Sequence, residues 1–292
     1  MSHKAGFVSI VGKPNVGKST LMNALVGEKM AIITPKAQTT RHRILGIVNG
    51  SNHQIVFSDT PGVIKPVYGM QKSMMKFVSG SLVDADIVLF VTDINEKYDE
   101  TEVLERLKDI VSPIAVIVNK IDESSEVAVK KKIDYWHELL NPAAIFAVSA
   151  LHDHNVSAVM QFILDHLPEH PAYYDKEALT DRPERFFVSE IIREKILKLY
   201  DKEIPYSTEV IITAFKDEPS IVRISAEIIV ERESQKNIII GKGGSMLKKV
   251  GTYARLDMED FLQKKVFLEL FVKVIADWRN SKNYLKRFGY ED

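Results

Sequence analysis

A phosphate-binding loop is predicted near the N-terminus of this 292-residue chain. It lies between an apolar run typical of a strand and a segment typical of a helix, and it matches the pattern G-x-x-x-x-G-K-[ST]. Its residues are Gly12, Lys13, Pro14, Asn15, Val16, Gly17, Lys18 and Ser19, followed by Thr20. Consecutive backbone N–H groups at a helix N-terminus attract phosphate oxygens. We therefore expect Lys18 to reach the β- and γ-phosphates of a nucleotide, and the Ser19 hydroxyl to bind Mg²⁺.

A second group of candidate residues follows the third predicted strand and consists of Asp59, Thr60, Pro61 and Gly62. A carboxylate at this place suits Mg²⁺ binding through water, and the Gly62 N–H is suited to donate to a γ-phosphate. The same tetrapeptide also makes a good turn. Its position directly after a strand is what favours the functional interpretation.

Two further groups predict the base that is recognised. Asn119, Lys120 and Asp122 end one predicted strand, and Ser149, Ala150 and Leu151 follow the next. A carboxylate at Asp122 accepts from both N1–H and N2–H₂ of guanine, a pair that adenine does not offer. Asn119 is expected to organise the loop or contact the base, the Lys120 stem to cover one base face, and the Ala150 N–H to meet guanine O6. These groups stand at strand ends, where open α/β sheets bind ligands.

The elements that must position these residues alternate through the first ~165 residues. Mostly continuous apolar runs predict strands buried on both faces, at 7–11, 44–48, 54–58, 87–92, 114–119 and 145–148. Helices are expected near 18–26, 70–82, 99–109, 128–140 and 155–166. This order predicts a mostly parallel sheet with helices on both sides.

The pattern changes after a proline-containing stretch. We expect a guanine-nucleotide-binding domain over 1–167, a linker over 168–182 and a second domain over 183–292. The second domain should contain a helix at 183–200, strands at 207–215 and 221–230, a short helix, a long helix near 245–263 and a last strand at 265–274. Trp278, Tyr284, Phe288 and Tyr290 either stack on bases or close the core of this domain, and we favour the core.

Composition excludes several classes of protein. Hydrophobic residues make up 45% and charged residues 27% of the chain, and cysteine is absent, which removes disulfides, thiolate metal sites and a Cys nucleophile. Apolar runs are too short to span a bilayer, so a cytoplasmic protein is expected. Residues 236–292 hold 12 Lys/Arg and 7 Asp/Glu, a surplus of five positive charges that favours a polyanionic partner or marks a solvated helical face.

A glycine-rich loop joins two predicted helices within this basic region. The loop resembles that of KH domains, and the resemblance implies that Ile240, Gly241, Lys242, Gly243, Gly244, Lys248 and Lys249 bind RNA. Glycines without side-chain bulk allow a nucleic-acid backbone to approach, and the lysines supply positive potential. A G-x-x-G pattern alone is weak, but the element order and the basic surplus strengthen it.

The first domain resembles translation-factor-type GTPases, with an α/β P-loop G domain and a mostly parallel sheet. The resemblance implies GTP/GDP and Mg²⁺ as ligands, catalytic roles for Lys18, Thr40 and Gly62, and a metal site of Ser19, Thr40 and Asp59. Either Thr39 or Thr40 could complete the Mg²⁺ shell, and we favour Thr40. Val63, which replaces the glutamine of Ras-like enzymes, implies slow intrinsic hydrolysis, and Asn15 implies a K⁺ ion near the phosphates.

The second domain resembles a smaller C-terminal α+β KH (type II) domain, and the two together resemble the Era family of bacterial GTPases. That resemblance implies a nucleotide-switched factor that binds the 3′ end of 16S rRNA, assists assembly of the small ribosomal subunit and touches the inner face of the cell membrane peripherally. A monomer that does not bind DNA is expected. Two alternatives are a passive RNA-assembly chaperone and an ATP-using kinase or NTPase, and Asp122 argues against the latter.

Overall fold

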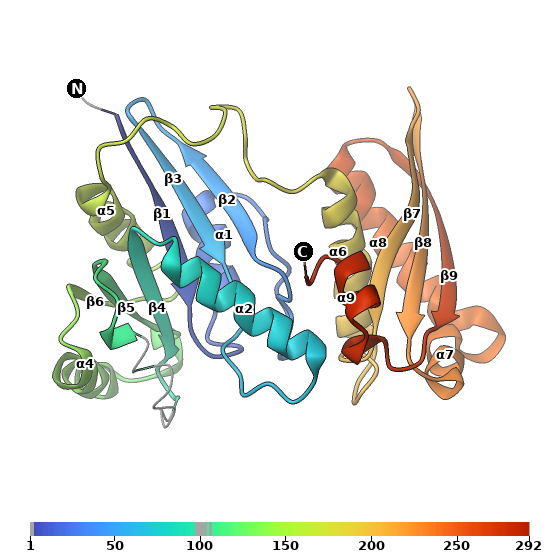
Figure 1. Ribbon diagram of the computed structural model, residues 1–292, viewed down its shortest axis with the longest axis horizontal. Coiled ribbons are helices and arrows are strands. Elements are labelled where there is room, and N and C mark those ends of the chain that lie inside the picture. Colours follow the sequence, from blue (N-terminus) through green and yellow to red (C-terminus); the bar gives the residue numbers. More distant parts are fainter. Residues whose placement is uncertain (1–2, 97–103, 105–106, 292) are drawn as a thin grey trace. The chain divides into compact units, whose positions relative to one another are not determined.

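The computed structural model describes residues 3–96, 104 and 107–291, which form two compact units (Figure 1). One unit contains residues 1–67 and 71–181, and the other contains residues 68–70 and 182–292. Residues 168–181, which were predicted as a linker, therefore group with the G domain. Among the described residues, no helix combines the length and the apolar character needed to cross a membrane.

The G domain is a six-stranded sheet with the order β2-β3-β1-β4-β5-β6. The strands are β1 (Lys4–Val11), β2 (Ile44–Asn49), β3 (His53–Asp59), β4 (Ile87–Asp93), β5 (Ile114–Asn119) and β6 (Ala144–Ala147). All neighbours pair in parallel except β2 and β3, so the predicted mostly parallel sheet is confirmed. A short turn joins β2 to β3, and this is why the edge strand β2 runs antiparallel to its neighbour.

Helices cover both faces of this sheet (Figure 1). They are α1 (Lys18–Val26), α2 (Gly69–Val83), α4 (Glu126–Leu140) and α5 (Val156–His166). Side chains of α2 and α4 share one buried cluster with β4 and β5, in which Trp136 meets Phe90 edge to face at 5.3 Å. The helix predicted near 99–109 falls mostly outside the described residues.

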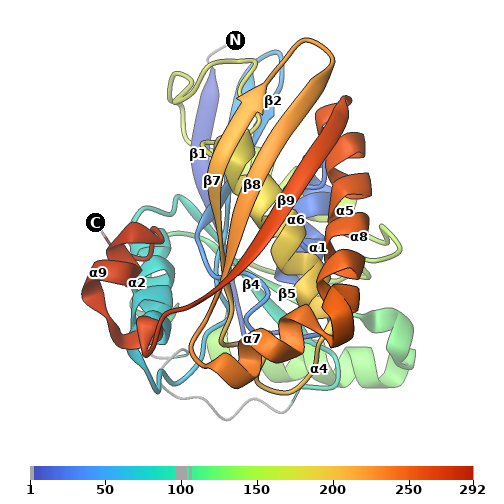
Figure 2. The same ribbon diagram turned by 90° about the vertical axis from the view of Figure 1, so that its right-hand side faces the viewer.

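The second unit has the element order expected of a type II KH domain. Its elements are α6 (Glu184–Leu199), β7 (Glu209–Asp217), β8 (Ile221–Val230), α7 (Glu233–Ile240), α8 (Ser245–Leu262), β9 (Lys265–Val274) and α9 (Lys282–Arg287). The sheet order is β7-β8-β9, with β7 antiparallel and β9 parallel to β8. Figure 2 shows these strands with α6 behind them, and residues of α6 and α8 close the core against one sheet face.

Two predicted boundaries in this domain were wrong for identifiable reasons. The strand predicted at 207–215 runs over 209–217, because the hydroxyls of Ser207 and Thr208 bond back to the carbonyls of Glu203 and Ile204 and close a turn. The first helix begins at Glu184, since Pro183 is extended (φ −71°, ψ 159°) and occupies the N-cap position.

The aromatic residues near the C-terminus are buried (Trp278 and Tyr290) or half-buried (Tyr284 and Phe288). Trp278 and Tyr290 are buried, and their polar atoms bond to the Ser207 carbonyl (3.2 Å) and the Glu209 carboxylate (2.5 Å). Phe288 packs its ring edge against Trp278 at 5.5 Å. The prediction that this group closes the KH core is confirmed for Trp278 and Tyr290.

Candidate functional site

The predicted phosphate-binding loop connects β1 to α1 and is held in an unusual backbone conformation. Gly12 and Gly17 have φ values of +155° and +97°, a region that side chains disfavour. A Cβ at Gly12 would lie 2.1 Å from the carbonyl oxygen of Val91. Both glycines are therefore required by the close approach of neighbouring segments, and the loop is closed over the N-terminus of α1.

Lys18 is buried at the base of this loop. It is 6% exposed and its Nζ donates to the Lys13 carbonyl at 2.7 Å, in the position where phosphate oxygens would compete for it. Burial lowers the pKa of Lys18 to about 8, although the charges of Asp59 and Glu96 oppose this shift. A bound phosphate would raise this pKa again and keep the amine charged, which fits the predicted role.

Three oxygen-bearing side chains meet where Mg²⁺ is predicted. The Ser19 hydroxyl lies 2.7 Å from Asp59 Oδ2 and 2.9 Å from Thr40 Oγ1, and Thr40 lies 3.2 Å from the same carboxylate oxygen. Burial raises the pKa of Asp59, and Asp59 Oδ1 is buried with no hydrogen-bond partner among the described residues. Two hydroxyls and one incompletely satisfied carboxylate form an oxygen donor set that fits Mg²⁺.

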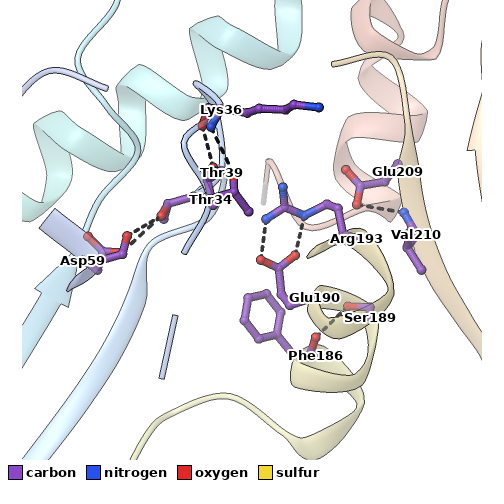
Figure 3. Close-up of polar contacts among 12 residues, drawn as sticks. Thr34, Lys36, Thr39, Asp59, Phe186, Ser189, Glu190, Arg193, Glu209 and Val210 are labelled. Atoms are coloured by element: carbon purple, nitrogen blue, oxygen red, sulfur yellow. Dashed lines mark hydrogen bonds and ion pairs between the residues drawn. The ribbon is translucent and has the colours of Figure 1, made fainter. Parts of the chain in front are cut away.

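The choice between the two threonines depends on this geometry. Thr39 instead bonds to the Thr34 hydroxyl (2.7 Å) and to the Lys36 carbonyl (2.6 Å), within its own loop (Figure 3). Thr40 is 8% exposed and faces Asp59. The geometry therefore favours Thr40 as the metal-binding threonine.

The segment after β3 packs closely on the phosphate-binding loop. Thr60 donates its hydroxyl proton to the Ile10 carbonyl (2.8 Å), and the Val63 N–H donates to the Gly12 carbonyl (3.0 Å). A Cβ at Gly62 would lie 2.6 Å from the Pro14 nitrogen. The Val63 side chain packs on the core cluster beneath α2, and as an aliphatic group it has no atom that could orient a water molecule.

The base-reading residues are linked to the phosphate loop through Asn119. Its Nδ2 donates to the Val16 carbonyl (2.8 Å), and its Oδ1 accepts from the Ala150 N–H (3.0 Å). Asn119 thus organises the loops, which is one of its two predicted roles. In this structure the Ala150 N–H donates to Asn119 and not to a base. Its donation to guanine O6 stays a prediction.

Asp122 and Lys120 lie at the open end of the same site. The neighbouring Ser149 side chain keeps the pKa of Asp122 below its ordinary value, so that the carboxylate is charged and ready to accept. Lys120 has a left-handed backbone (φ 63°) and its Nζ reaches Asp93 at 2.6 Å, which extends its aliphatic stem beside the cavity.

A cavity of about 550 Å³ joins the phosphate, metal and base positions. The predicted residues in its lining are Pro14, Asn15, Gly17, Lys18, Ser19, Thr20, Thr40, Gly62, Asn119, Lys120, Asp122, Ser149 and Leu151. Other lining residues, which the sequence analysis did not single out, are Ile32, Ile33, Thr34, Pro35 and Glu123. Ile32, Ile33, Thr34 and Pro35 belong to the loop before β2. The Asn15 side chain donates to the Pro35 carbonyl at 2.9 Å and so connects that loop to the phosphate-binding loop.

The candidate RNA site of the KH domain surrounds the loop between α7 and α8. Gly241, Gly243 and Gly244 all have positive φ values (72°, 59° and 79°), and a Cβ at Gly241 would lie 2.7 Å from the Met246 side chain. Lys248 and Lys249 border the same loop, Lys242 lies within it, and Ile240 is half-buried. The loop therefore presents bare backbone beside three exposed lysines, an arrangement suited to a nucleic-acid backbone.

The arrangement matches two known domain families. A family model described as a 50S ribosome-binding GTPase matches residues 7–120, and one described as a KH domain matches residues 203–279. The GTPase Era of Alkaliphilus metalliredigens is 45% identical over 295 residues, which cover all of both chains. The chloroplastic GTPase ERA1 of Zea mays is 46% identical over 297 residues, covering 99% of this chain and 71% of that protein.

Solved structures agree with these relatives. A crystal structure of Era in complex with MgGDPNP and nucleotides 1506–1542 of 16S ribosomal RNA has a TM-score of 0.94 and 41% identity, and covers 99% of this chain and all of that one. A point variant of Aquifex aeolicus Era bound to GDP·AlF4⁻ has the same TM-score at 40% identity, again over 99% and 100% of the two chains. With its G domain followed by a KH domain, this chain belongs to the Era family of GTPases.

Proposed function

We propose that this chain is a GTP-switched RNA-binding factor that binds the 3′ end of 16S rRNA and assists assembly of the small ribosomal subunit. The observation that carries the proposal is the contact of Thr40 and Ser19 with Asp59, because it joins the loop before β2 to the end of β3 at one metal position. Mg²⁺ bound there with GTP would neutralise charge on the phosphates. Loss of the γ-phosphate would release the two segments.

The chain's own residues support slow hydrolysis. Lys18 and the backbone of the phosphate loop hold the phosphates, and Gly62 lies against Pro14 where its N–H can meet the γ-phosphate. Val63 is half-buried against the core cluster, and it replaces the glutamine that orients the attacking water in Ras-like enzymes. Bound RNA or the ribosome would supply the missing acceleration.

A K⁺ ion near Asn15 is part of the proposal. The Asn15 side chain and the Pro35 carbonyl are hydrogen-bonded across the rim of the cavity, and both carry oxygens suited to a monovalent cation. GTP hydrolysis should therefore be faster in K⁺ buffer than in Na⁺ buffer. Equal hydrolysis rates in the two buffers would show that K⁺ takes no part in the reaction.

The proposal also includes a monomeric, cytoplasmic protein that touches the inner face of the cell membrane peripherally and does not bind DNA. The family resemblance supports the membrane contact. Flotation of the full chain with anionic vesicles, and light scattering after size-exclusion chromatography, test the membrane contact and the monomer.

The test of the function is a titration of the full chain with labelled single-stranded RNA from the 3′ end of 16S rRNA, followed by fluorescence anisotropy. RNA affinity is measured with a GTP analogue, with GDP and without nucleotide. We expect different affinities in the three states, and by linkage RNA must change GTP affinity by the same factor. Identical RNA affinities would favour a passive RNA chaperone whose nucleotide only stabilises the G domain.

A further inference from the structure

Residues 168–181 are not a free connection between the domains but lie along the G domain sheet. The segment starts beside β1, where the Ala5 N–H donates to the Pro168 carbonyl (3.1 Å) and the His170 N–H donates to the His3 carbonyl (3.1 Å). Further along, it reaches the open edge of β2, where the Ile47 N–H donates to the Leu179 carbonyl at 2.8 Å. We call residues 168–181 the strap.

One buried side chain fastens the strap to the hairpin of β2 and β3. Gln54 is fully buried, and its Oε1 accepts from the N–H groups of Tyr173 (2.8 Å) and Tyr174 (2.9 Å). Its Nε2 donates to the Tyr174 carbonyl (2.9 Å) and to Asn49 Oδ1 (2.7 Å). All four hydrogen-bonding positions of the amide are thus occupied, so releasing the strap would leave buried polar groups unpaired.

Apolar contacts hold the same part of the strap. Tyr174 and Ala178 pack on the cluster of Leu45, Ile47 and Val56, which belong to β2 and β3. The Tyr173 ring lies 4.8 Å from that of Phe7. The strap and the hairpin therefore form one packed unit.

The hairpin of β2 and β3 leads directly to the metal position, because β3 ends at Asp59. Ile44 and Asp59 are register partners at one end of the hairpin, and Thr40 stands four residues before Ile44. The register pair of Ile47 and Val56 is three residues further, or about 10 Å along the strands. The strap thus contacts the hairpin three residues along the strands from Asp59, whose carboxylate lies at the metal position.

The strap continues into the KH domain with little slack. Only residues 180–183 separate Leu179 from the start of α6 at Glu184. Four residues span at most about 14 Å, and a residue that precedes proline, as Arg182 does, is restricted to extended conformations. A shift of the hairpin that exceeds the slack of these four residues must therefore move α6 as well.

We infer that the strap transmits the nucleotide state from the β2–β3 hairpin to the KH domain. This inference rests on the proposed nucleotide switch and names its route. The strap stays bound to the hairpin through Gln54 and moves with it when the γ-phosphate is lost. The four residues before α6 carry that movement to the RNA-binding domain.

The first test slackens the connection and leaves the contacts of the strap intact. Gly-Ser-Gly-Ser is inserted between Asp181 and Arg182, and the control carries the same insertion between Glu218 and Pro219, in the exposed β7–β8 turn of the full chain. RNA affinity is measured with GTP analogue and with GDP. In the slack variant, we expect the ratio of RNA affinity with GTP analogue to RNA affinity with GDP to fall to about 1. The control should keep the wild-type ratio, and both variants should bind GDP with wild-type affinity. A wild-type ratio in the slack variant would overturn the inference.

The second test does not depend on RNA. Backbone amide NMR shifts of the full chain are compared between the GDP and GTP-analogue states at Tyr173, Tyr174 and Leu179, with α5 as the reference element. The strap amides should shift clearly more than those of α5, and equal small shifts would overturn the inference. If wild-type RNA affinity proves independent of the nucleotide, the proposed switch fails, while this comparison still decides whether the strap follows the hairpin.

Discussion

The Asn119 side chain lies directly against the backbone of Gly17, where a Cβ would stand 2.1 Å from Asn119 Nδ2. The same nitrogen donates to the Val16 carbonyl, and the other end of the amide accepts from the Ala150 N–H. One buried amide thus joins the phosphate loop to the loop that follows β6, and a glycine makes room for it. The phosphate and base parts of the cavity are held at a fixed distance as a result.

Asn119→Ala should weaken GDP binding about 5- to 150-fold, because the Val16 carbonyl and the Ala150 N–H would lose a buried partner at a cost of about 1–3 kcal/mol. Isothermal titration calorimetry measures the affinity. Gly17→Ala should be at least as severe, since it combines a clash with a strained backbone. Wild-type affinity in Asn119→Ala would mean that the bridge does not shape the site.

Asp122→Asn should change base preference from guanine to xanthine. An amide accepts less well from guanine N1–H and N2–H₂, but it can donate to the additional carbonyl of xanthine. The structure leaves the Asp122 carboxylate charged beside Ser149, so the wild type should favour guanine strongly. Competition of GDP, XDP and ADP for the site measures the preference, and a retained GDP preference in the variant would contradict the base-reading role.

GDP affinity should decline above pH 8 because of Lys18. Burial lowers the pKa of Lys18 to about 8 in the nucleotide-free protein, and a bound phosphate raises it again. Below pH 8 the amine is charged in both states, whereas above pH 8 binding must take up a proton. The affinity should then fall by up to about tenfold per pH unit.

Calorimetry in buffers of different ionisation enthalpy, between pH 7 and 9, checks this proton uptake. The control is Lys18→Gln, which should bind more weakly but lose the slope. A wild-type affinity that stays flat to pH 9 would show that Lys18 keeps its proton without nucleotide.

Tyr200→Phe should weaken RNA binding severalfold while nucleotide binding stays unchanged. The Tyr200 hydroxyl donates to the Ile239 carbonyl at 2.7 Å, at the end of α7 just before Gly241. Burial raises the pKa of Tyr200 to about 12, so the hydroxyl remains a donor across the physiological range. Loss of this hydrogen bond should loosen the last turn of α7 and lower the free energy of unfolding by about 1 kcal/mol.

The readouts for Tyr200→Phe are RNA anisotropy and thermal unfolding, with Tyr206→Phe as the control in the same domain. A purely structural role would lower the unfolding temperature without changing RNA affinity at 25 °C. Unchanged RNA affinity would therefore remove Tyr200 as a positioning residue for the glycine loop.

Local pattern alone determined much of this protein. The strand–loop–helix context of Gly12–Ser19, the polar groups after strands and the glycine loop between two helices are properties of short segments. The spacing of hydrophobic residues and the turn-forming residues within such segments indicate whether each element is a helix or a strand. The parallel sheet and the order of elements in the KH domain could therefore be predicted from them. The residues predicted to bind the nucleotide then lie together at one edge of the sheet, because parallel strands have their carboxyl ends on the same side.

Only the tertiary structure decided which neighbours share a contact. Thr39 and Thr40 are adjacent in the sequence, and the packing of their loop on Asp59 separates a metal-facing hydroxyl from an internal one. Gln54 and Tyr174 are 120 residues apart, so no local pattern reveals that a proline-containing linker is fastened to the β2–β3 hairpin. Hydrogen bonds between distant segments form only when the sheet is complete. The sequence by itself therefore determined the helices and strands, and only the folded chain determined which of their side chains meet.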